Sequence, residues 1–332
     1  MLGITIIPEK YKPKPKKKIV TFGNCHFNEI FKNLTNYQYV INNCMYSHIS
    51  INAYVDNCAH GYLRDRSYFT NEHIELLKKA DVLIYQNIET DRGFLNNKEV
   101  LKLIKPNCIK IKIPHYRSSI YHYSWYEEPY FEKMREEVNK ITSIKEKIEY
   151  IKKYIADINN KKYDAKKLDE FIDKQLMDFK KIDSYSDISM YDYFVNNYKK
   201  IQLINGRSYP TSYFFFILSK KILEKLNIYE NLSFTELIRR RPTHQKYFSK
   251  HTTFPIFNFW YKYNNFTFEK QFYWDNRIMI RDPIKDYEFY YLQIKAGNDF
   301  GEDSTFCNIW TIRSKFNPLE KVKKLRNLIN NT

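Results

Sequence analysis

The stretch KIVTFGNCH, residues 18–26, decides the fold class of this chain. Residues 18–22 form a short apolar run that predicts a buried strand, and Gly23 lets the chain turn sharply off that strand. A helical pattern follows from His26 to about Leu34. A strand, a tight glycine turn and a helix are the opening unit of a doubly wound α/β domain.

Strand and helix patterns continue to alternate through the first third of the chain. Strands are predicted at residues 81–85 and 108–113, with a further candidate at 37–41, and helices at 70–79 and 98–104. Strands that alternate with helices predict a mainly parallel sheet, whose ligand site lies at the carboxyl ends of the strands. The predicted fold class is therefore α/β.

Two long amphipathic helices are predicted in the middle of the chain. Apolar residues recur there at three- and four-residue steps, within 134–155 and within 168–179. Further helices are predicted at 190–198 and 211–226. The dense, alternating aromatic residues of 256–312 favour β hairpins.

These elements divide the chain into three predicted parts. A flexible basic leader covers residues 1–17, and an α/β core covers 18–255 with the helical insertion at about 130–182. A β-rich extension follows over 256–332 and ends in a helix. We see no internal repeat.

Composition and charge limit the class of protein. Hydrophobic residues make up 43% of the 332, which is enough for a packed core and excludes general disorder. No apolar run is long enough for a membrane helix, and no secretory signal is visible. The five cysteines lack metal-binding or disulfide spacing, so we expect reduced thiols and a cytoplasmic protein, or one in the host cytoplasm if the source is a large DNA virus.

The net charge of +17 suggests an anionic partner. The abundance of Lys, Asn, Ile and Tyr is typical of a very AT-rich genome, however, and this coding bias inflates Lys whatever the function. We therefore do not expect nucleic-acid binding, and an acidic small ligand such as a nucleotide-like cofactor fits the charge equally well.

Cys25 is the sharpest candidate for chemistry. It stands at the first turn of the predicted helix, where N–H groups and the helix dipole stabilise a thiolate, an oxyanion or a phosphate. Asn24 adds a neutral donor, and His26 follows directly. The arrangement is that of the strand–turn–helix nucleophile of serine esterases, with Cys in place of Ser. The structural alternative is a small residue packed at a crowded turn.

Two further polar segments follow predicted strands. Gln86 and Asn87 could stabilise an oxyanion or bind a sugar hydroxyl, or form an ordinary polar loop. His115, Arg117 and Ser118 offer a general base, an anion-binding group and a hydroxyl. His60, in a loop before a glycine, is another candidate base. No residue set has zinc spacing, so we predict no metal, and no glycine-rich phosphate-binding motif is present.

Four segments, in order, resemble the WcbI-like polysaccharide biosynthesis proteins, regarded as acetyltransferases of capsule sugars that bind coenzyme A. The family's Gly-Asn-Cys-Gln stands here as GNCH, residues 23–26. A strand ending in Gln is similar to 80–88, and a strand ending in Ile-Pro before aromatic residues is similar to 111–123. An Asn-His-Pro-Thr-like segment resembles 205–212, with Tyr209 where the family favours His. The resemblance covers about residues 18–228.

The resemblance implies a cytosolic enzyme that moves an acetyl group from acetyl-CoA to a hydroxyl or amine of a sugar or nucleotide-sugar substrate. The implied catalytic residues are Cys25 with His115 or His60. The implied contacts to coenzyme A are Arg117, Ser118, Tyr209, Thr211 and Ser212. Cys25 would either be acylated or line the thioester site while a histidine deprotonates the acceptor.

Two other functions remain open from the sequence. One is an esterase or thioesterase on the same scaffold, with water as the acceptor. The other is a non-catalytic protein that binds a glycan or nucleic acid through its basic, aromatic-rich surface. The sequence predicts neither the acceptor nor the oligomeric state.

Overall fold

The computed structural model describes residues 16–51, 70–88, 97–123, 137, 140–205, 209–240, 256, 258–268, 271–274 and 277–280. The chain forms two compact units. Unit 1 comprises residues 1–117, 178–195 and 208–249, and unit 2 comprises residues 118–177, 196–207 and 250–332. The predicted leader, apart from Lys16 and Lys17, and everything after Ile280 lie outside the described residues.

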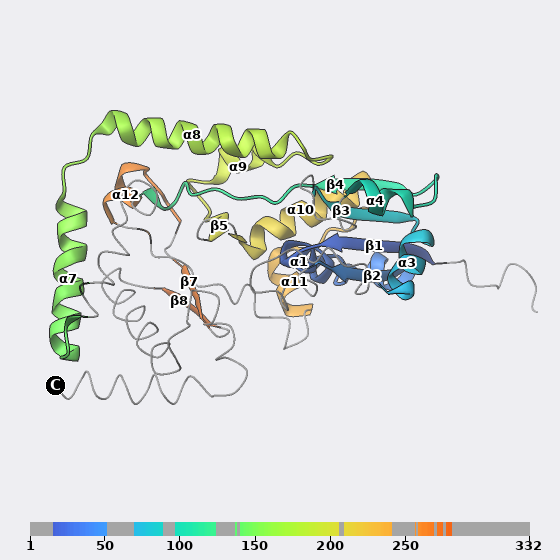
Figure 1. Ribbon diagram of the computed structural model, residues 1–332, viewed down its shortest axis with the longest axis horizontal. Helices are drawn as coiled ribbons and strands as arrows, with labels where there is room; N and C mark the ends of the chain where they lie inside the picture. Colours follow the sequence, from blue (N-terminus) through green and yellow to red (C-terminus); the bar gives the residue numbers. More distant parts are fainter. Residues whose placement is uncertain are drawn as a thin grey trace, which may run out of the picture. The chain divides into compact units, whose positions relative to one another are not determined.

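Unit 1 is built on a parallel sheet of four strands in the order β2-β1-β3-β4 (Figure 1). The strands are β1 (Lys17–Gly23), β2 (Cys44–Ser50), β3 (Val82–Gln86) and β4 (Ile109–Ile113). From β1 the chain first builds β2 on one side and then crosses to β3 on the other. The strand order therefore reverses between β1 and β3, where a doubly wound sheet binds its ligand. The α/β fold predicted from the sequence is confirmed.

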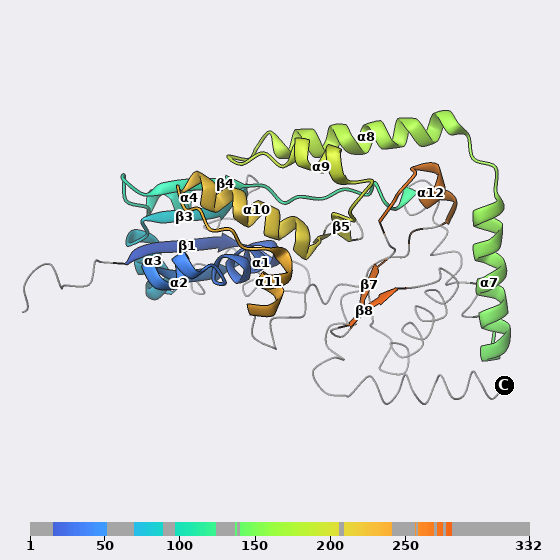
Figure 2. The same cartoon turned by 180° about the vertical axis from the view of Figure 1, so that it is seen from behind.

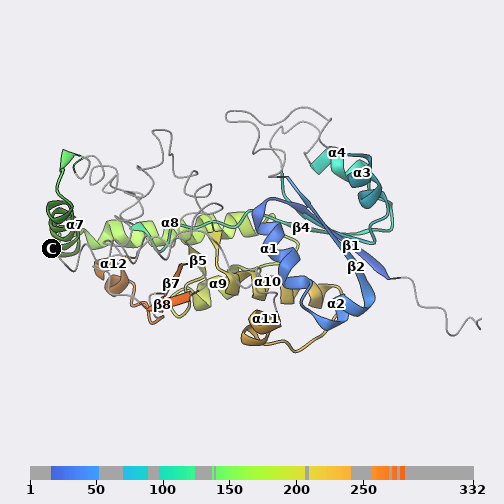
Figure 3. The same ribbon diagram turned by 90° about the horizontal axis from the view of Figure 1, so that it is seen from below.

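Helices cover both faces of this sheet (Figures 1 and 3). One face carries α3 (Asn71–Lys78) and α4 (Asn97–Lys102). The opposite face carries α1 (Cys25–Leu34), α2 (Gln38–Asn43), α10 (Ser212–Lys225) and α11 (Phe234–Arg240). Figure 2 shows the same layers from behind. The helix after β1 and the helix before β3 lie on opposite faces, as the crossover to the other side of β1 requires.

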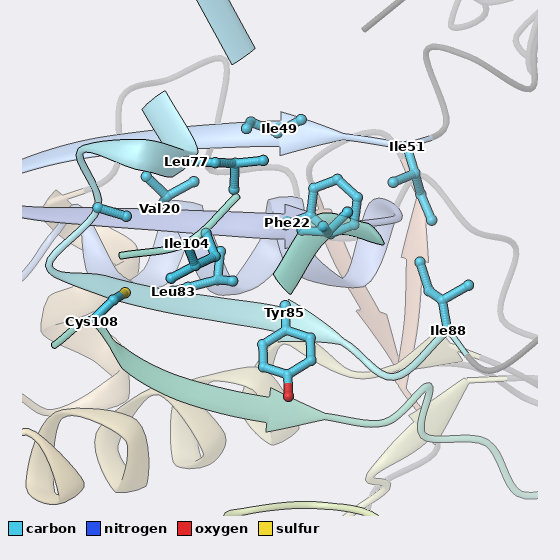
Figure 4. Close-up of a cluster of buried hydrophobic side chains, with 12 residues drawn as sticks. Val20, Phe22, Ile49, Ile51, Leu77, Leu83, Tyr85, Ile88, Ile104 and Cys108 are labelled. Atoms are coloured by element: carbon cyan, nitrogen blue, oxygen red, sulfur yellow. The ribbon is translucent and has the colours of Figure 1, made fainter. Parts of the chain in front are cut away.

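The core below α3 and α4 is a continuous apolar cluster (Figure 4). Strand residues alternate inward, and Leu77 and Val100 reach them from the two helices. The cluster consists of Val20, Phe22, Ile49, Ile51, Leu77, Ala80, Leu83, Tyr85, Ile88, Val100, Ile104 and Cys108. On the other face α1 packs on β1 and β2, and α10 packs on α1. Burial on both faces explains why β1 and β3 read as apolar runs rather than as polar–apolar alternation.

A buried carboxylate fixes the chain after β4. Asp183, 5% exposed, accepts hydrogen bonds from the hydroxyls of Tyr116 (2.7 Å) and Ser189 (2.6 Å). The backbone N–H groups of Met190 and Tyr191 also donate to it. These bonds satisfy both oxygens of a carboxylate that would otherwise be costly to bury. The segment that carries His115 is thereby held at a defined place beyond the sheet.

The edge of β4 is capped by a loop. The Lys112 N–H donates to Asp187 Oδ2 (2.6 Å), and the Asp187 N–H donates to the Lys112 carbonyl (2.9 Å). These two bonds occupy groups that would otherwise be free to pair with another strand.

The predicted pair of long helices is confirmed, but the first of them begins at Ile144, later than the predicted 134, and residues 141–143 before it are not helical. The two helices are α7 (Ile144–Asn160) and α8 (Ala165–Asp183), and α9 (Tyr191–Asn197) follows them. The remaining short elements are β5 (Ile204–Asn205), β6 (Tyr209–Pro210), α12 (Asn258–Tyr263), β7 (Gln271–Trp274) and β8 (Arg277–Ile280). In unit 2, Trp260 is 1% exposed, donates from its indole N–H to the Ile120 carbonyl (2.8 Å) and stacks on Tyr123.

The β-rich prediction for the C-terminal part is correct for one hairpin and wrong for one segment. β7 and β8 pair in antiparallel fashion, but the alternating aromatic residues of 259–263 lie in the helix α12. Trp260 and Asn264, four residues apart, are both buried, which is helical periodicity. Aromatic residues at nearly every position hide this period, because the polar contrast that distinguishes a strand from a helix is missing.

The strand predicted at 37–41 is also wrong. This segment forms α2, and the strand follows it as β2. Both oxygens of the Glu230 carboxylate accept hydrogen bonds from the N–H groups of Gln38 and Tyr39 (3.0 Å each), so a residue about 190 positions away caps this short helix. Local sequence contains no sign of such a cap.

Among the described residues, no helix is both long enough and apolar enough to cross a membrane.

A pH-dependent loss of stability is expected from His48 on β2. Burial, helped by the nearby charge of Lys32, lowers the pKa of His48 from 6.5 to about 4, and Thr21 Oγ1 lies 2.9 Å from its Nδ1. As the pH falls from 6.5 to about 4, His48 becomes protonated in the unfolded chain but stays neutral in the folded chain, so the free energy of unfolding decreases. We expect His48→Gln to reduce that loss by up to about 3 kcal/mol.

The measurement is urea unfolding of wild type and His48→Gln at several pH values between 6.5 and about 4. The quantity to compare is the change of the free energy of unfolding with pH, not its absolute value. Equal pH slopes for wild type and His48→Gln would show that His48 titrates normally in the folded state.

Candidate functional site

The first part of the candidate site is the turn between β1 and α1. Asn24 is the N-cap of α1, and its Oδ1 accepts a hydrogen bond from the His26 N–H (3.0 Å). Its carbonyl accepts from the N–H groups of Phe27 (2.9 Å) and Asn28 (3.3 Å). An anion could reach these three N–H groups only by displacing Asn24. The anion-binding role predicted for this helix terminus therefore gains no support from them.

Gly23 is required here by packing. A side chain at this position would overlap the ring of Phe27, which is fully buried in the core of unit 1. From the sequence, Gly23 was interpreted as the residue that allows a sharp turn. The backbone of Gly23 is outside the left-handed region, however, so the turn does not need the conformational freedom of glycine. The close approach of Phe27 lets α1 begin directly at the end of β1.

Gln86 joins the two strands at which the strand order reverses. It is the last residue of β3, is 5% exposed, and its Oε1 accepts a hydrogen bond from the Asn24 backbone N–H (2.9 Å). The side chain of one strand end thus holds the turn that follows the neighbouring strand. The prediction that Gln86 lies beside the Cys25 turn is confirmed, and its amide oxygen is used in fixing that turn.

Cys25 is the first residue of α1 and is partly exposed. The structure describes two further cysteines, Cys44 and Cys108; both are buried, and burial raises the pKa of their thiols. The Sγ of Cys25 lies 4.0 Å from the hydroxyl of Tyr209. Of these three thiols, Cys25 is the one that a ligand can reach.

Two histidines meet beside Cys25. The ring of His26, 3% exposed, lies edge-on to the ring of His115, with 4.1 Å between centroids. The ring of Tyr209 also lies against His26 (5.6 Å), as does that of Phe215 (5.4 Å). Segments after β1, after β4 and before α10 therefore converge on one cluster. We call Cys25, His26, His115 and Tyr209 the thiol cluster.

The segment before α10 contributes Tyr209 and starts the helix. Tyr209 and Pro210 form β6, and Thr211 is the N-cap of α10, with its Oγ1 accepting a hydrogen bond from the Phe214 N–H (3.3 Å). Ser212 is the first helical residue and is half-buried. Tyr209 thus approaches Cys25 as expected, whereas Thr211 is engaged in the helix cap. Contacts of Thr211 and Ser212 with a ligand stay predictions.

The other predicted site residues are placed as follows. The Asn87 N–H donates to the Ile113 carbonyl (3.0 Å), which ties the ends of β3 and β4 together. Arg117 is exposed, two residues beyond His115. Ser118 belongs to unit 2, where it is buried and hydrogen-bonded to Gln175. His60 lies outside the described residues. Within the part that the structure describes, no three His, Cys, Asp or Glu side chains form a metal-binding group.

Sequence reasoning missed the pairing of His26 with His115 and the contact of Phe215. His26 is one residue past Cys25, and its helical position turns it into the layer between α1 and α10 rather than toward Asn24. Two histidines separated by 89 positions meet because each follows a strand of the same parallel sheet. Their placement after strand ends was the available signal.

The thiol cluster has the groups that acyl chemistry needs. It offers a soft nucleophile at a helix start, two imidazoles that can carry protons, and a phenol next to the sulfur. All of these lie in unit 1 at the carboxyl edge of the sheet.

A solved structure has the same fold. WcbI, a polysaccharide biosynthesis enzyme, matches with a TM-score of 0.55 and 13% identity, over 83% of this chain and 90% of that protein. The matched structure is described as native protein without a disulfide bond between coenzyme A and one of its cysteines. No protein-family model and no curated protein matches the sequence. The resemblance seen in the motifs is thus supported as a distant relation in fold.

Removing the Gln86 side chain should weaken the sheet at its switch point. Gln86→Ala leaves the Asn24 N–H without its acceptor at a place that water reaches poorly, so we expect a loss of about 1–3 kcal/mol in the free energy of unfolding. Chemical denaturation measures it. The matched control is Gln38→Ala on the exposed α2, which should change stability by less than about 0.5 kcal/mol. Equal effects of the two changes would contradict the role given to Gln86.

Proposed function

We propose that this chain is an acyltransferase that moves an acetyl group from acetyl-CoA to a hydroxyl or amine of a sugar in glycan biosynthesis. The observation that carries the proposal is the thiol cluster. Cys25 is partly exposed, starts a helix at the switch point of a parallel sheet, and has a phenol and an imidazole pair beside it. Ligands of doubly wound folds bind at this edge.

The fold likeness is compatible with an enzyme of glycan biosynthesis. WcbI is a polysaccharide biosynthesis enzyme, and its matched structure is described as native protein without a disulfide bond between coenzyme A and one of its cysteines. Cys25 is the candidate for the corresponding position here.

In the proposed mechanism Cys25 is the nucleophile. Its sulfur gives its proton to an imidazole and attacks the thioester carbonyl, and the acetyl group stays on Cys25. The bond to the sulfur of coenzyme A breaks, and coenzyme A leaves as a thiol with the proton from the imidazole. An acceptor hydroxyl or amine then attacks the acetyl carbon and gives its proton to an imidazole, which passes it to the Cys25 sulfur as the bond between that sulfur and the acetyl group breaks. His115 is the candidate base because its side chain is partly exposed, although its Nε2 is buried, and the buried His26 lies edge-on to its ring.

Tyr209 is positioned to act on the sulfur. Its hydroxyl is 4.0 Å from Cys25 Sγ, so a short movement brings it to hydrogen-bonding distance. A phenol can donate to a thiolate before attack or to the carbonyl oxygen as negative charge builds on it. The amide nitrogen of Gln86 is a second candidate donor, since its oxygen is already held by Asn24.

The phosphates of coenzyme A need cationic partners on the surface. The N–H groups of His26, Phe27 and Asn28 in α1 are engaged by Asn24, so that helix start is a poor phosphate site. Arg117 is exposed near the end of β4, and the net charge of +17 raises the concentration of anionic ligands near the chain. Arg117 is therefore the candidate phosphate contact.

Coenzyme A and acetyl-CoA should raise the melting temperature by several degrees, which corresponds to roughly 3 kcal/mol at a hundredfold excess over Kd. Cys25→Ala should keep this shift but lose at least about a hundredfold in the release of free coenzyme A with a sugar acceptor. Cys44→Ala, a change of a buried thiol, is the control and should keep the rate. Thermal shift and a thiol-release assay measure both effects.

Three results would contradict the proposal in different ways. If millimolar coenzyme A does not stabilise the protein, acetyl-CoA is not its acyl donor. Release of coenzyme A at the same rate with and without any sugar would indicate a thioesterase. If Cys25→Ala transfers the acetyl group at the full rate, the histidines are the catalytic groups and Cys25 only lines the site.

A further inference from the structure

A pocket lies in unit 1, at the end of α10 away from the thiol cluster. Its volume is about 420 Å³, within the usual range for small-molecule sites. It is lined by Tyr37, which follows α1, by the last turns of α10 and by the loop that follows this helix. The charged and polar groups in the lining are Lys220, Glu224, Glu230 and Asn231.

The course of two helices separates this pocket from the thiol cluster. α1 begins at Cys25 and ends just before Tyr37, and α10 begins next to Tyr209 and ends after Glu224. The two helices pack on each other and run in the same direction. α1 has 10 residues and is about 15 Å long, so a small ligand in the pocket cannot also contact Cys25.

The hydroxyl of Tyr37 gives this pocket a polar group in need of a partner. The side chain is 1% exposed, and no hydrogen bond to its hydroxyl is made by any described residue. Burial, with the charges of Glu230 and Glu224, raises the pKa of Tyr37 well above its usual value, so the hydroxyl stays a donor at neutral pH. Buried hydroxyls normally have a partner, which here would be a water or a ligand group in the pocket.

The lining carries one cation and two carboxylates, and a cation outside the lining offsets one of the carboxylates. Glu230 is held by Arg240 (3.0 Å) and by the start of α2. Lys220 and Glu224, both exposed on α10, then remain as one positive and one negative group at the rim. Such a rim attracts neither an anion nor a cation strongly. It offers hydrogen-bond donors and acceptors to a neutral, polar ligand.

An aromatic ring and an apolar floor complete the pocket. Tyr229 is 77% exposed, while Leu223 and Ile228 beneath are buried. An exposed tyrosine offers a flat apolar face for stacking, at little entropic cost. A ligand that matches this lining has one apolar face and hydroxyl groups around its edge, which is the chemistry of a pyranose ring.

We propose that this pocket binds a neutral sugar ring, with Tyr229 against the face of the ring and the Tyr37 hydroxyl donating to one of its oxygens. Glu224, Lys220 and Asn231 are the groups in reach of the remaining hydroxyls. This binding site is separate from the thiol cluster and does not depend on the reaction proposed for that cluster.

Saturation-transfer NMR with three methyl glycosides, of glucose, mannose and galactose, tests the proposal on the full chain. We expect transfer to at least one of them. Tyr229→Ala should abolish it, and Tyr37→Phe should raise the dissociation constant about three- to tenfold while leaving the fold intact, because it removes one hydroxyl from a ring of the same shape. The control is Tyr185→Ala, which removes another exposed tyrosine (40% exposed) and should bind like wild type.

Cys25→Ala distinguishes this site from the proposed active centre. It should bind the glycoside like wild type, whatever the outcome of the acetyl-CoA experiments. No transfer to any of the three glycosides would overturn the proposal and leave water as the partner of Tyr37. Transfer that survives in Tyr229→Ala and Tyr37→Phe, or that is lost in Cys25→Ala, would place the sugar elsewhere and would overturn it as well.

Discussion

The hydrogen bond from the Asn24 N–H to the side chain of Gln86 is the constraint on which the candidate site depends. It joins the ends of β1 and β3, the two neighbouring strands between which the strand order reverses. With this bond in place, Asn24 can cap α1, and Cys25 becomes the first residue of that helix. Phe27 packs over Gly23 and removes the remaining freedom of the turn. One glutamine thus links sheet topology to the position of a thiol.

The helices α1 and α10, which pack side by side, form a different site at each of their ends. Their N-terminal ends bring His26, Tyr209 and Phe215 together with His115. Their C-terminal ends, with the loop that Glu230 anchors to α2, form the pocket next to Tyr37. The same helix pair therefore has the thiol cluster at one end and a tyrosine-rimmed cavity at the other. In the proposed function, the first would carry the chemistry and the second would hold a sugar.

The sequence allowed the α/β fold, the Cys25 turn and the Gln86 strand end to be predicted, because each is a local pattern: an apolar run, a glycine, and a polar residue after a strand. The strand predicted at 37–41 failed because Glu230, far along the chain, caps that segment as a helix. The helix α12 was hidden by aromatic residues at almost every position. The contact of His26 with His115 depends on strand order, which local sequence does not contain.

The central claim is that Cys25 carries the acyl group, and trapping that state tests it most directly. The purified protein is mixed with acetyl-CoA without an acceptor, quenched in acid and digested, and the cysteine peptides are read by mass spectrometry. We predict an acetyl group on the peptide of Cys25, which disappears when a sugar acceptor is added before the quench. An unmodified Cys25 in a protein that still transfers acetyl groups to a sugar would contradict the account.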